Sequence, residues 1–287
     1  MPFWQKTFAD DGQEITPAQV SLIVSILSAG EFIGALLAAP FADILGRRWG
    51  LFIASGFVFN LGVILQTVAV SQPIFVAGRF FAGLGVGILS AIVPLYQSES
   101  LPKWIRGSIV GSYQLAITIV CIHHRYHLTT SLTAFQGLFL AAIVNNATAN
   151  RNDTGSYRIP IALQFAWSII ICVGLLFLPE TPRFLVKQDK HDEAAKSLSR
   201  LRRLPPTHPA LLEELSEIEA NHRYEMTLGK ATYLDCFKGT IGKRLLTGCL
   251  LQALQQMTGV NFIFYYGTQY FQHAGFKDPF IISVVIK

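Results

Sequence analysis

Charged side chains are scarce in this chain. Asp, Glu, Lys and Arg make up 14% of its 287 residues, against about 25% in an ordinary soluble domain. Hydrophobic residues make up 51%, and the mean hydropathy is +0.41. This balance excludes a disordered chain and is untypical of a cytosolic enzyme. It indicates a polytopic membrane protein.

Cysteine is also rare, and the opening residues are not expected to form a signal peptide. The four cysteines show neither paired nor metal-ligand spacing, which excludes a disulfide scaffold. The opening residues MPFWQKTFADDGQE lack the basic region and apolar stretch of a secretory signal. The net charge of +5 could suggest nucleic acid, but basic-aromatic interleaving and zinc spacing are missing. The basic residues gather instead in 183–244, where charge alternates with Leu as in amphipathic helices on a membrane face.

Long apolar runs are what the chain does contain. A membrane helix needs about 20 mostly apolar residues to cross a core of about 30 Å. A sixth run lies within 107–145, and Phe280–Ile286 begins another. We therefore expect an all-α polytopic helix bundle. The five clear spans are Val20–Ala42, Gly50–Val70, Ile74–Tyr96, Ile161–Leu178 and Leu245–Phe264.

The orientation of these helices follows weakly from the basic residues. Lys and Arg gather in cytoplasmic loops, and alternating helices split them 16 to 4 between the two sides. Without the long 183–244 loop the split is even. Two glycosylation sequons, at Asn146 and Asn152, lie in one loop that we expect outside. They favour the same orientation.

Arg79 lies near the start of an apolar helix, where inserting its charge into the membrane is unfavourable. A central Arg costs about 2.5–3.5 kcal/mol on insertion scales. Arg79 therefore either reaches the outer interface or faces a cavity or an acidic partner. Both interpretations remain open from the residues alone.

A row of amides marks the last clear span. Gln252, Gln255 and Gln256 should share one helical face with residue 259, and Asn261 follows in the same helix. Such amides can bond neighbouring helices together. They can also bind a sugar, whose hydroxyls donate and accept hydrogen bonds as amides do. Tyr265 and Tyr266 would then offer flat surfaces to the sugar ring.

The spacing of Gly83, Gly85 and Gly87 is similar to that of the glycines in a nucleotide-binding loop. They follow no strand and lie in the middle of an apolar helix. Close packing of helices through small residues is the expected role.

Four motifs together resemble the sugar porter family of the major facilitator superfamily, and fungal hexose transporters in particular. They occur in the family's order and cover nearly the whole chain. The motifs are Asp43-Ile-Leu-Gly-Arg47-Arg48, Glu99-Ser-Leu-Pro-Lys-Trp-Ile-Arg106-Gly107, Pro179-Glu180-Thr-Pro-Arg183, and Gln255-Gln256-Met-Thr-Gly-Val-Asn261 followed by Tyr265-Tyr266.

The resemblance implies a multi-pass transporter, at the plasma membrane, that moves a monosaccharide with protons and needs no cofactor or metal. Arg79 would pair with an acid on helix 1 in proton-coupled members. The sugar would be held by Gln114, Gln255, Gln256 and Asn261, with Tyr265 and Tyr266 beside it. A cytosolic charge network that latches the two halves would comprise Asp43, Arg47, Arg48, Glu99, Arg106, Glu180 and Arg183.

The resemblance also implies twelve helices in two halves, of which this sequence matches helices 2–7 and the start of helix 8. The expected parts are a first bundle over 1–180, a cytosolic linker over 181–243 and the start of a second bundle over 244–287. Such a chain alone is expected to be inactive. A truncated product or a sugar sensor is the alternative, and an enzyme is rejected because no triad, metal set or phosphate loop occurs.

Residues 120–136 interrupt the fifth helix of the family pattern. They include His123, His124 and His127, yet no other metal ligand converges there. Removing them joins Gly107–Ile119 to Gly137–Val144 in a run of about 21 residues, the length of one membrane helix. The codon of Val120 must begin with GT, and Phe135-Gln136 can be encoded by TTTCAG. We therefore predict that 120–136 is an intron read as protein.

Overall fold

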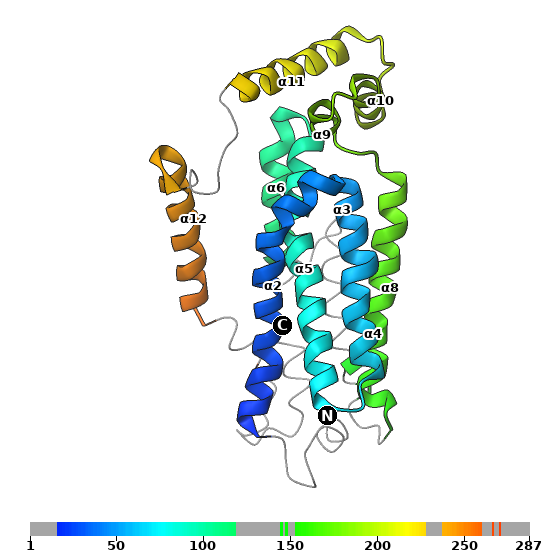
Figure 1. Ribbon diagram of the computed structural model, residues 1–287, viewed down its shortest axis with the longest axis vertical. Coiled ribbons are helices and arrows are strands. Elements are labelled where there is room, and N and C mark those ends of the chain that lie inside the picture. The colour runs from blue at the N-terminus through cyan, green and yellow to red at the C-terminus, as the bar shows by residue number, and fades with distance from the viewer. Residues whose placement is uncertain are drawn as a thin grey trace, which may run out of the picture. The chain divides into compact units, whose positions relative to one another are not determined.

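The computed structural model describes residues 16–118, 144–145, 147–148, 153–227, 237–259, 266 and 270, without the side chains of Pro17 and 112–118. The predicted insert 120–136 lies outside these residues. Every regular element in the described ranges is a helix (Figure 1), which confirms the all-α prediction. The chain divides into two compact units, Met1–Leu215 and Ser216–Lys287, which are described separately.

Four helical spans in the described ranges are long and apolar enough to cross a membrane: Ala18–Leu45, Arg47–Val68, Gln72–Ser100 and Gly155–Phe177. They correspond to the first four predicted spans and extend into polar residues at their ends. The helices that form them are α2 (Pro17–Leu45), α3 (Arg47–Ile53), η1 (Ala54–Phe59), α4 (Asn60–Val68), α5 (Gln72–Ser100) and α8 (Gly155–Phe177).

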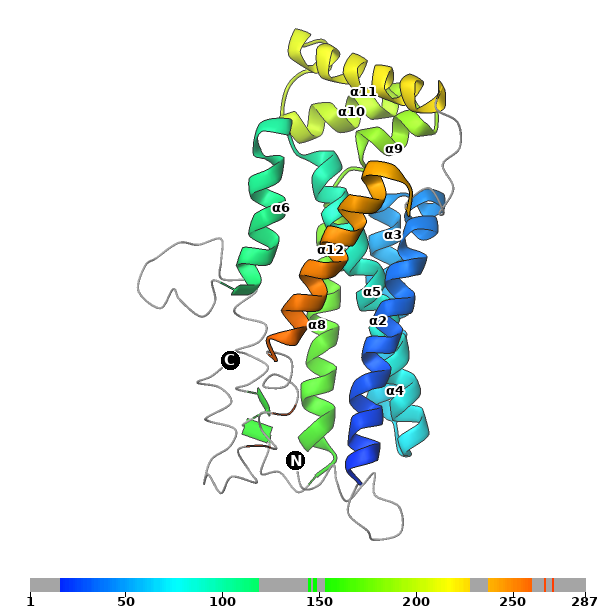
Figure 2. The same cartoon turned by 90° about the vertical axis from the view of Figure 1, so that its left-hand side faces the viewer.

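Helices α2 and α5 lie side by side along their length (Figures 1 and 2). Glycines on both helices make this contact close. A Cβ on Gly34 would lie 3.1 Å from the Ile88 nitrogen and closer still to the Leu84 carbonyl oxygen. Gly83 and Gly87 of α5 press in the same way on the backbone of α2. The prediction that these glycines serve helix packing is confirmed.

Buried amide and hydroxyl groups form hydrogen bonds between other helices of the bundle. The Gln66 side chain on α4 donates to the carbonyl oxygens of Gly62 and of Gly78 on α5, each at 3.2 Å. The π-helical turn η1, which the sequence did not indicate, receives a hydrogen bond from α8. There the Ser168 hydroxyl donates to the Ser55 carbonyl oxygen at 2.8 Å. Such bonds are worth about 0.5–1.5 kcal/mol each.

The predicted polar linker contains three helices, α9 (Pro182–Lys187), α10 (His191–Arg202) and α11 (Pro209–Thr227). Helices α9 and α10 and the beginning of α11 belong to the first unit, and Leu185, Leu198 and Leu211 on them are buried. Arg202 at the end of α10 donates to the Ser100 carbonyl oxygen at 3.0 Å and pairs with Glu214.

Helix α6 (Lys103–Thr118) follows α5 in the chain.

The last predicted span is partly wrong. Helix α12 runs over Gly239–Met257 rather than Leu245–Phe264. Gly259 has a φ of 74°, in the left-handed region that ends helices. Residue 259 therefore does not continue the helical face of Gln252, Gln255 and Gln256.

The glycine contact yields a prediction for stability. Gly34→Val should force α2 away from α5, because its side chain would enter the α5 backbone. Overpacking of this kind costs about 1–3 kcal/mol, or a fall of roughly 2–12 °C in Tm at 2–4 °C per kcal/mol. Thermal unfolding of the purified protein checks it. Gly174→Val is the matched control, because a Cβ there meets nothing within 4 Å. Equal Tm values for the two variants would contradict the close contact.

Candidate functional site

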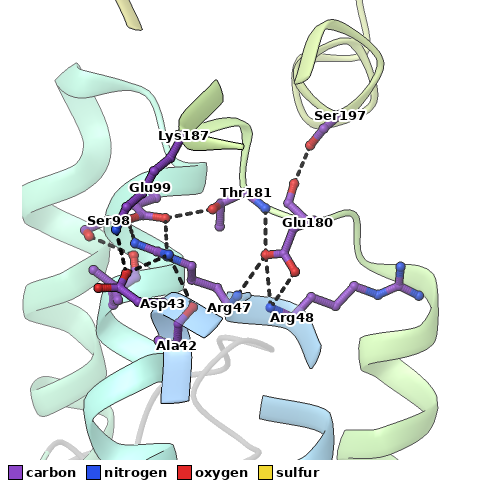
Figure 3. A network of polar contacts seen from close by, with 11 residues as sticks. Ala42, Asp43, Arg47, Arg48, Ser98, Glu99, Glu180, Thr181, Lys187 and Ser197 are labelled. Carbon is purple, nitrogen blue, oxygen red and sulfur yellow. Dashed lines mark hydrogen bonds and ion pairs between the residues drawn. The ribbon is translucent and has the colours of Figure 1, made fainter. Parts of the chain in front are cut away.

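A cluster of charged groups forms where α2, α5 and α8 end and α3 begins (Figure 3). We call it the charged junction and define it by its residues. They are Asp43, Arg47, Arg48, Glu99, Glu180, Thr181 and Lys187.

Arg47 and Glu99 form the nearly buried ion pair of this junction. Arg47 Nε and Nη2 donate to the two Glu99 carboxylate oxygens at 3.0 and 3.1 Å, and each side chain is 9% exposed. Arg47 Nη1 also donates to the Ala42 carbonyl oxygen, and the Thr181 hydroxyl donates to Glu99 at 2.7 Å. A buried ion pair is tolerated when its remaining polar atoms are satisfied, and this one meets that condition.

The Glu180 carboxylate caps the start of α3 from a distant part of the chain. Its Oε1 accepts hydrogen bonds from the backbone N–H of Arg47 and of Arg48, each at 3.0 Å. The first N–H groups of a helix lack partners within the helix, and the helix dipole favours negative charge there. Glu180 therefore joins the segment after α8 to the first turn of α3.

Arg48 connects the start of α3 to the end of α8. Its Nε and Nη2 donate to the carbonyl oxygens of Leu175 and Leu176 at 2.9 and 2.8 Å. These carbonyls belong to the last turn of α8, where a cation is favoured. An acid that follows α8 thus caps α3, while a base that begins α3 caps α8.

Gly46 makes room for this arrangement. Its φ of 89° and ψ of 168° suit glycine. A Cβ there would lie 2.6 Å from Glu180 Oε2 and 2.9 Å from the Phe184 ring. That ring also carries the Arg47 guanidinium 5.1 Å from its centroid.

Not every residue predicted for the charge network joins it. Asp43 does join it from a half-exposed position, and it accepts hydrogen bonds from Arg47 at 3.3 Å and from Lys187 at 3.0 Å. Arg106 donates instead to the Leu101 carbonyl oxygen at 3.4 Å. Arg183 is exposed on α9. The sequence analysis missed Thr181 and Lys187, although both lie within or next to the Pro179–Arg183 motif.

At membrane depth, the structure adds an acid that the sequence analysis missed. Arg79 is half-buried on α5 and lies 5.5 Å from the centroid of the Phe75 ring. Glu31 is half-buried at the middle of α2. An acidic residue inside an apolar run was the signal that could have identified it.

The predicted sugar ligands are described only in part. Gln255 and Gln256 are exposed on α12, and Tyr266 is half-buried. Gln114 lies on α6, but its side chain is outside the described residues, as are Asn261 and Tyr265.

The two sequons also lie largely outside the described residues, because Asn146 and Asn152 themselves are not described. Their hydroxyl residues differ. The Thr148 hydroxyl donates to the Val144 carbonyl oxygen and is buried, whereas Thr154 is exposed before α8. Glycosylation at either position stays a prediction.

These long apolar helices, packed through glycines and tied at one end by charged residues, define a multi-pass helical membrane protein. Residues 3–287 match the family model described as "Sugar (and other) transporter". The chain belongs to this family. The model describes membrane transporters rather than enzymes.

Curated relatives cover nearly the whole chain. It is 60% identical over 291 residues to "Major facilitator-type transporter ecdD" of Aspergillus rugulosus, covering 99% of this chain and 50% of that one. It is 52% identical to "Probable glucose transporter rco-3" of Neurospora crassa, covering 95% and 43%. It is 41% identical to "High glucose sensor RGT2" of Saccharomyces cerevisiae, covering 99% and 36%. The chain thus spans about half the length of these relatives or less.

A solved structure shows the same fold. The proton:xylose symporter XylE, of the major facilitator superfamily, bound to 6-bromo-6-deoxy-D-glucose, matches with a TM-score of 0.76 at 22% identity. The match covers 99% of this chain and 60% of that one. The fold is therefore that of the major facilitator superfamily, as the motifs predicted.

Gly46 provides a direct test of the junction. Gly46→Ala should lower Tm by about 5–10 °C, because it combines backbone strain of about 1–3 kcal/mol with a collision against Glu180. Thermal unfolding measures the change. Gly239→Ala is the control, since Gly239 also has a positive φ, 57°, but a Cβ there meets nothing within 4 Å. Its Tm should fall by less than about half as much. An equal fall would show that the junction does not depend on Gly46.

Proposed function

We propose that the complete protein transports a monosaccharide, a hexose, across the plasma membrane by alternating access. The match of residues 3–287 to the sugar transporter family carries this proposal. The names of two relatives, a probable glucose transporter and a facilitator-type transporter, support it. In this fold the substrate lies near the bilayer midplane, between two helix bundles that rock against each other.

The proposed bundles follow the expected division. Residues 1–180 form the first bundle, 181–243 the cytosolic linker, and 244–287 the beginning of the second bundle. The charged junction would face the cytosol. Its tight internal bonding would keep the first bundle rigid, while Arg183 is exposed at its edge.

Gln255 offers a test of the proposed sugar ligands, because its side chain is exposed on α12. In the complete protein, Gln255→Ala should weaken apparent sugar affinity about 3–10-fold, the loss of one hydrogen bond of about 0.5–1.5 kcal/mol. Competition against uptake of labelled hexose measures it. Gln252→Ala, one turn earlier on the same helix, should change affinity less. Unchanged affinity with a lower Tm would instead assign Gln255 to helix packing.

A sugar sensor is the second candidate, because one relative at 41% identity is named as a high glucose sensor. Labelled-hexose uptake by the complete protein separates the two. A transporter accumulates or equilibrates the sugar, whereas a sensor binds it without uptake. We expect no uptake from residues 1–287 expressed alone, because alternating access needs both bundles.

A further inference from the structure

Glu31 is an acid at the centre of a membrane-spanning helix. Helix α2 runs from Pro17 to Leu45, and Glu31 is its middle residue. At about 1.5 Å per residue it lies roughly 21 Å from either end. The hydrocarbon core is about 30 Å thick, so Glu31 lies at the depth of its midplane.

The surroundings of Glu31 on α2 are mostly apolar, with the hydroxyl residue Ser28 one turn before it. One turn or two away on the same face lie Val24, Leu27, Ala35 and Ala38. Asp43 is the other ionisable residue of α2, and it is engaged in the charged junction. Within the described residues, the Glu31 carboxylate makes no hydrogen bond and no ion pair.

Helix α5 holds Glu31 in place through its backbone. A Cβ on Gly87 would lie 2.9 Å from the Glu31 Cα, and one on Gly83 would lie 3.2 Å from its nitrogen. The carboxyl group is therefore carried by a rigid, closely packed part of the bundle. The described residues nevertheless leave its side chain only half-buried.

The charged and titratable groups on the helices packed against α2 leave Glu31 unneutralised. On α5, Arg79 lies four residues before Gly83, and its guanidinium lies over the Phe75 ring. Tyr96 donates to the Pro179 carbonyl oxygen. The remaining groups, Glu99 on α5 and Arg47 and Arg48 on α3, are engaged in the charged junction.

An ionised side chain at this depth is unfavourable on insertion scales. Intramembrane acids accordingly face pathways for ions or substrate, and proton relays are built from them. A neutral carboxyl avoids that cost, and a carboxyl that faces such a pathway can exchange its proton with water. Whether the neutral or the ionised form of the Glu31 carboxyl group is favoured therefore depends on the hydration of the site.

We propose that Glu31 is a proton-binding site at the midplane, which gains a proton when its surroundings dry and releases it when they become hydrated. This inference rests on the proposed transport function and assigns a proton carrier to it. The site belongs to α2 and does not involve the predicted partner of Arg79.

A hydrophobic carbodiimide tests the protonation directly, because it adds to protonated carboxyl groups in apolar surroundings. The complete protein in membranes is labelled across pH 5–8, and the peptide containing Glu31 is quantified by mass spectrometry. We expect labelling that is high at low pH and falls as pH rises. Labelling absent at every pH, or constant across the range, would overturn the proposal. Glu31→Gln supplies the blank for this peptide.

Transport supplies the second measurement. In Glu31→Gln, accumulation of labelled hexose driven by a pH gradient should fall by roughly tenfold, within the 5–150-fold range typical of coupling between two ligands. Counterflow of the same sugar at equal pH should stay near the wild-type rate, and Glu31→Asp should restore accumulation. Wild-type accumulation in Glu31→Gln would overturn the proposal and leave the transport function intact. Titrating Glu31 labelling in a protein that moves no sugar would overturn the transport function instead.

Discussion

The Glu180 carboxylate at the first turn of α3 is the interaction on which the charged junction depends. It accepts backbone N–H groups from Arg47 and Arg48 at 3.0 Å and so fixes the start of the second membrane-spanning segment against the end of the fourth. Arg48 returns the connection by donating to the last carbonyls of α8. With the backbone of residue 47 fixed, the Arg47 side chain reaches both oxygens of Glu99 on α5. Three membrane-spanning helices are thereby joined at one end.

Polar groups in this bundle fall into two kinds. Those of the charged junction are bonded to one another, which the cost of burying charge requires. Removing one partner of such a buried pair costs about 3–5 kcal/mol, so these residues hold the bundle together. Glu31 differs, because its neighbours are mostly apolar residues and glycines and no described group neutralises it. A group of this second kind is free to change its charge during a transport cycle.

Much of the fold was predictable because length and hydropathy alone identify membrane spans. Four described spans lie where the apolar runs placed them. The glycine packing was predictable for a related reason, since small residues in the middle of an apolar helix have few other uses. The end of helix α12 was misplaced because hydropathy alone does not show the backbone turn at Gly259.

The residues of the charged junction were largely predictable from the sequence, but the hydrogen bonds that they form were less so. The motifs named Arg47, Glu99 and Glu180, but only the folded chain shows that Glu180 bonds to backbone N–H groups. Arg48 was expected to pair with acids, yet its guanidinium bonds to carbonyl oxygens that any sequence supplies. Glu31 was overlooked because it belongs to no motif. Partners in the second unit lie beyond such reasoning, since each contact there depends on how the units meet.

The central claim is that Glu180 holds the first turn of α3 through backbone hydrogen bonds. Hydrogen–deuterium exchange at the amides of Arg47 and Arg48, compared between the complete protein and its Glu180→Ala variant, tests this most directly. The account predicts slow exchange in the wild type. In the variant it predicts exchange faster by roughly tenfold, the equivalent of one lost hydrogen bond of about 1.4 kcal/mol, with α10 unchanged. Equal exchange at these two amides in both proteins would contradict it.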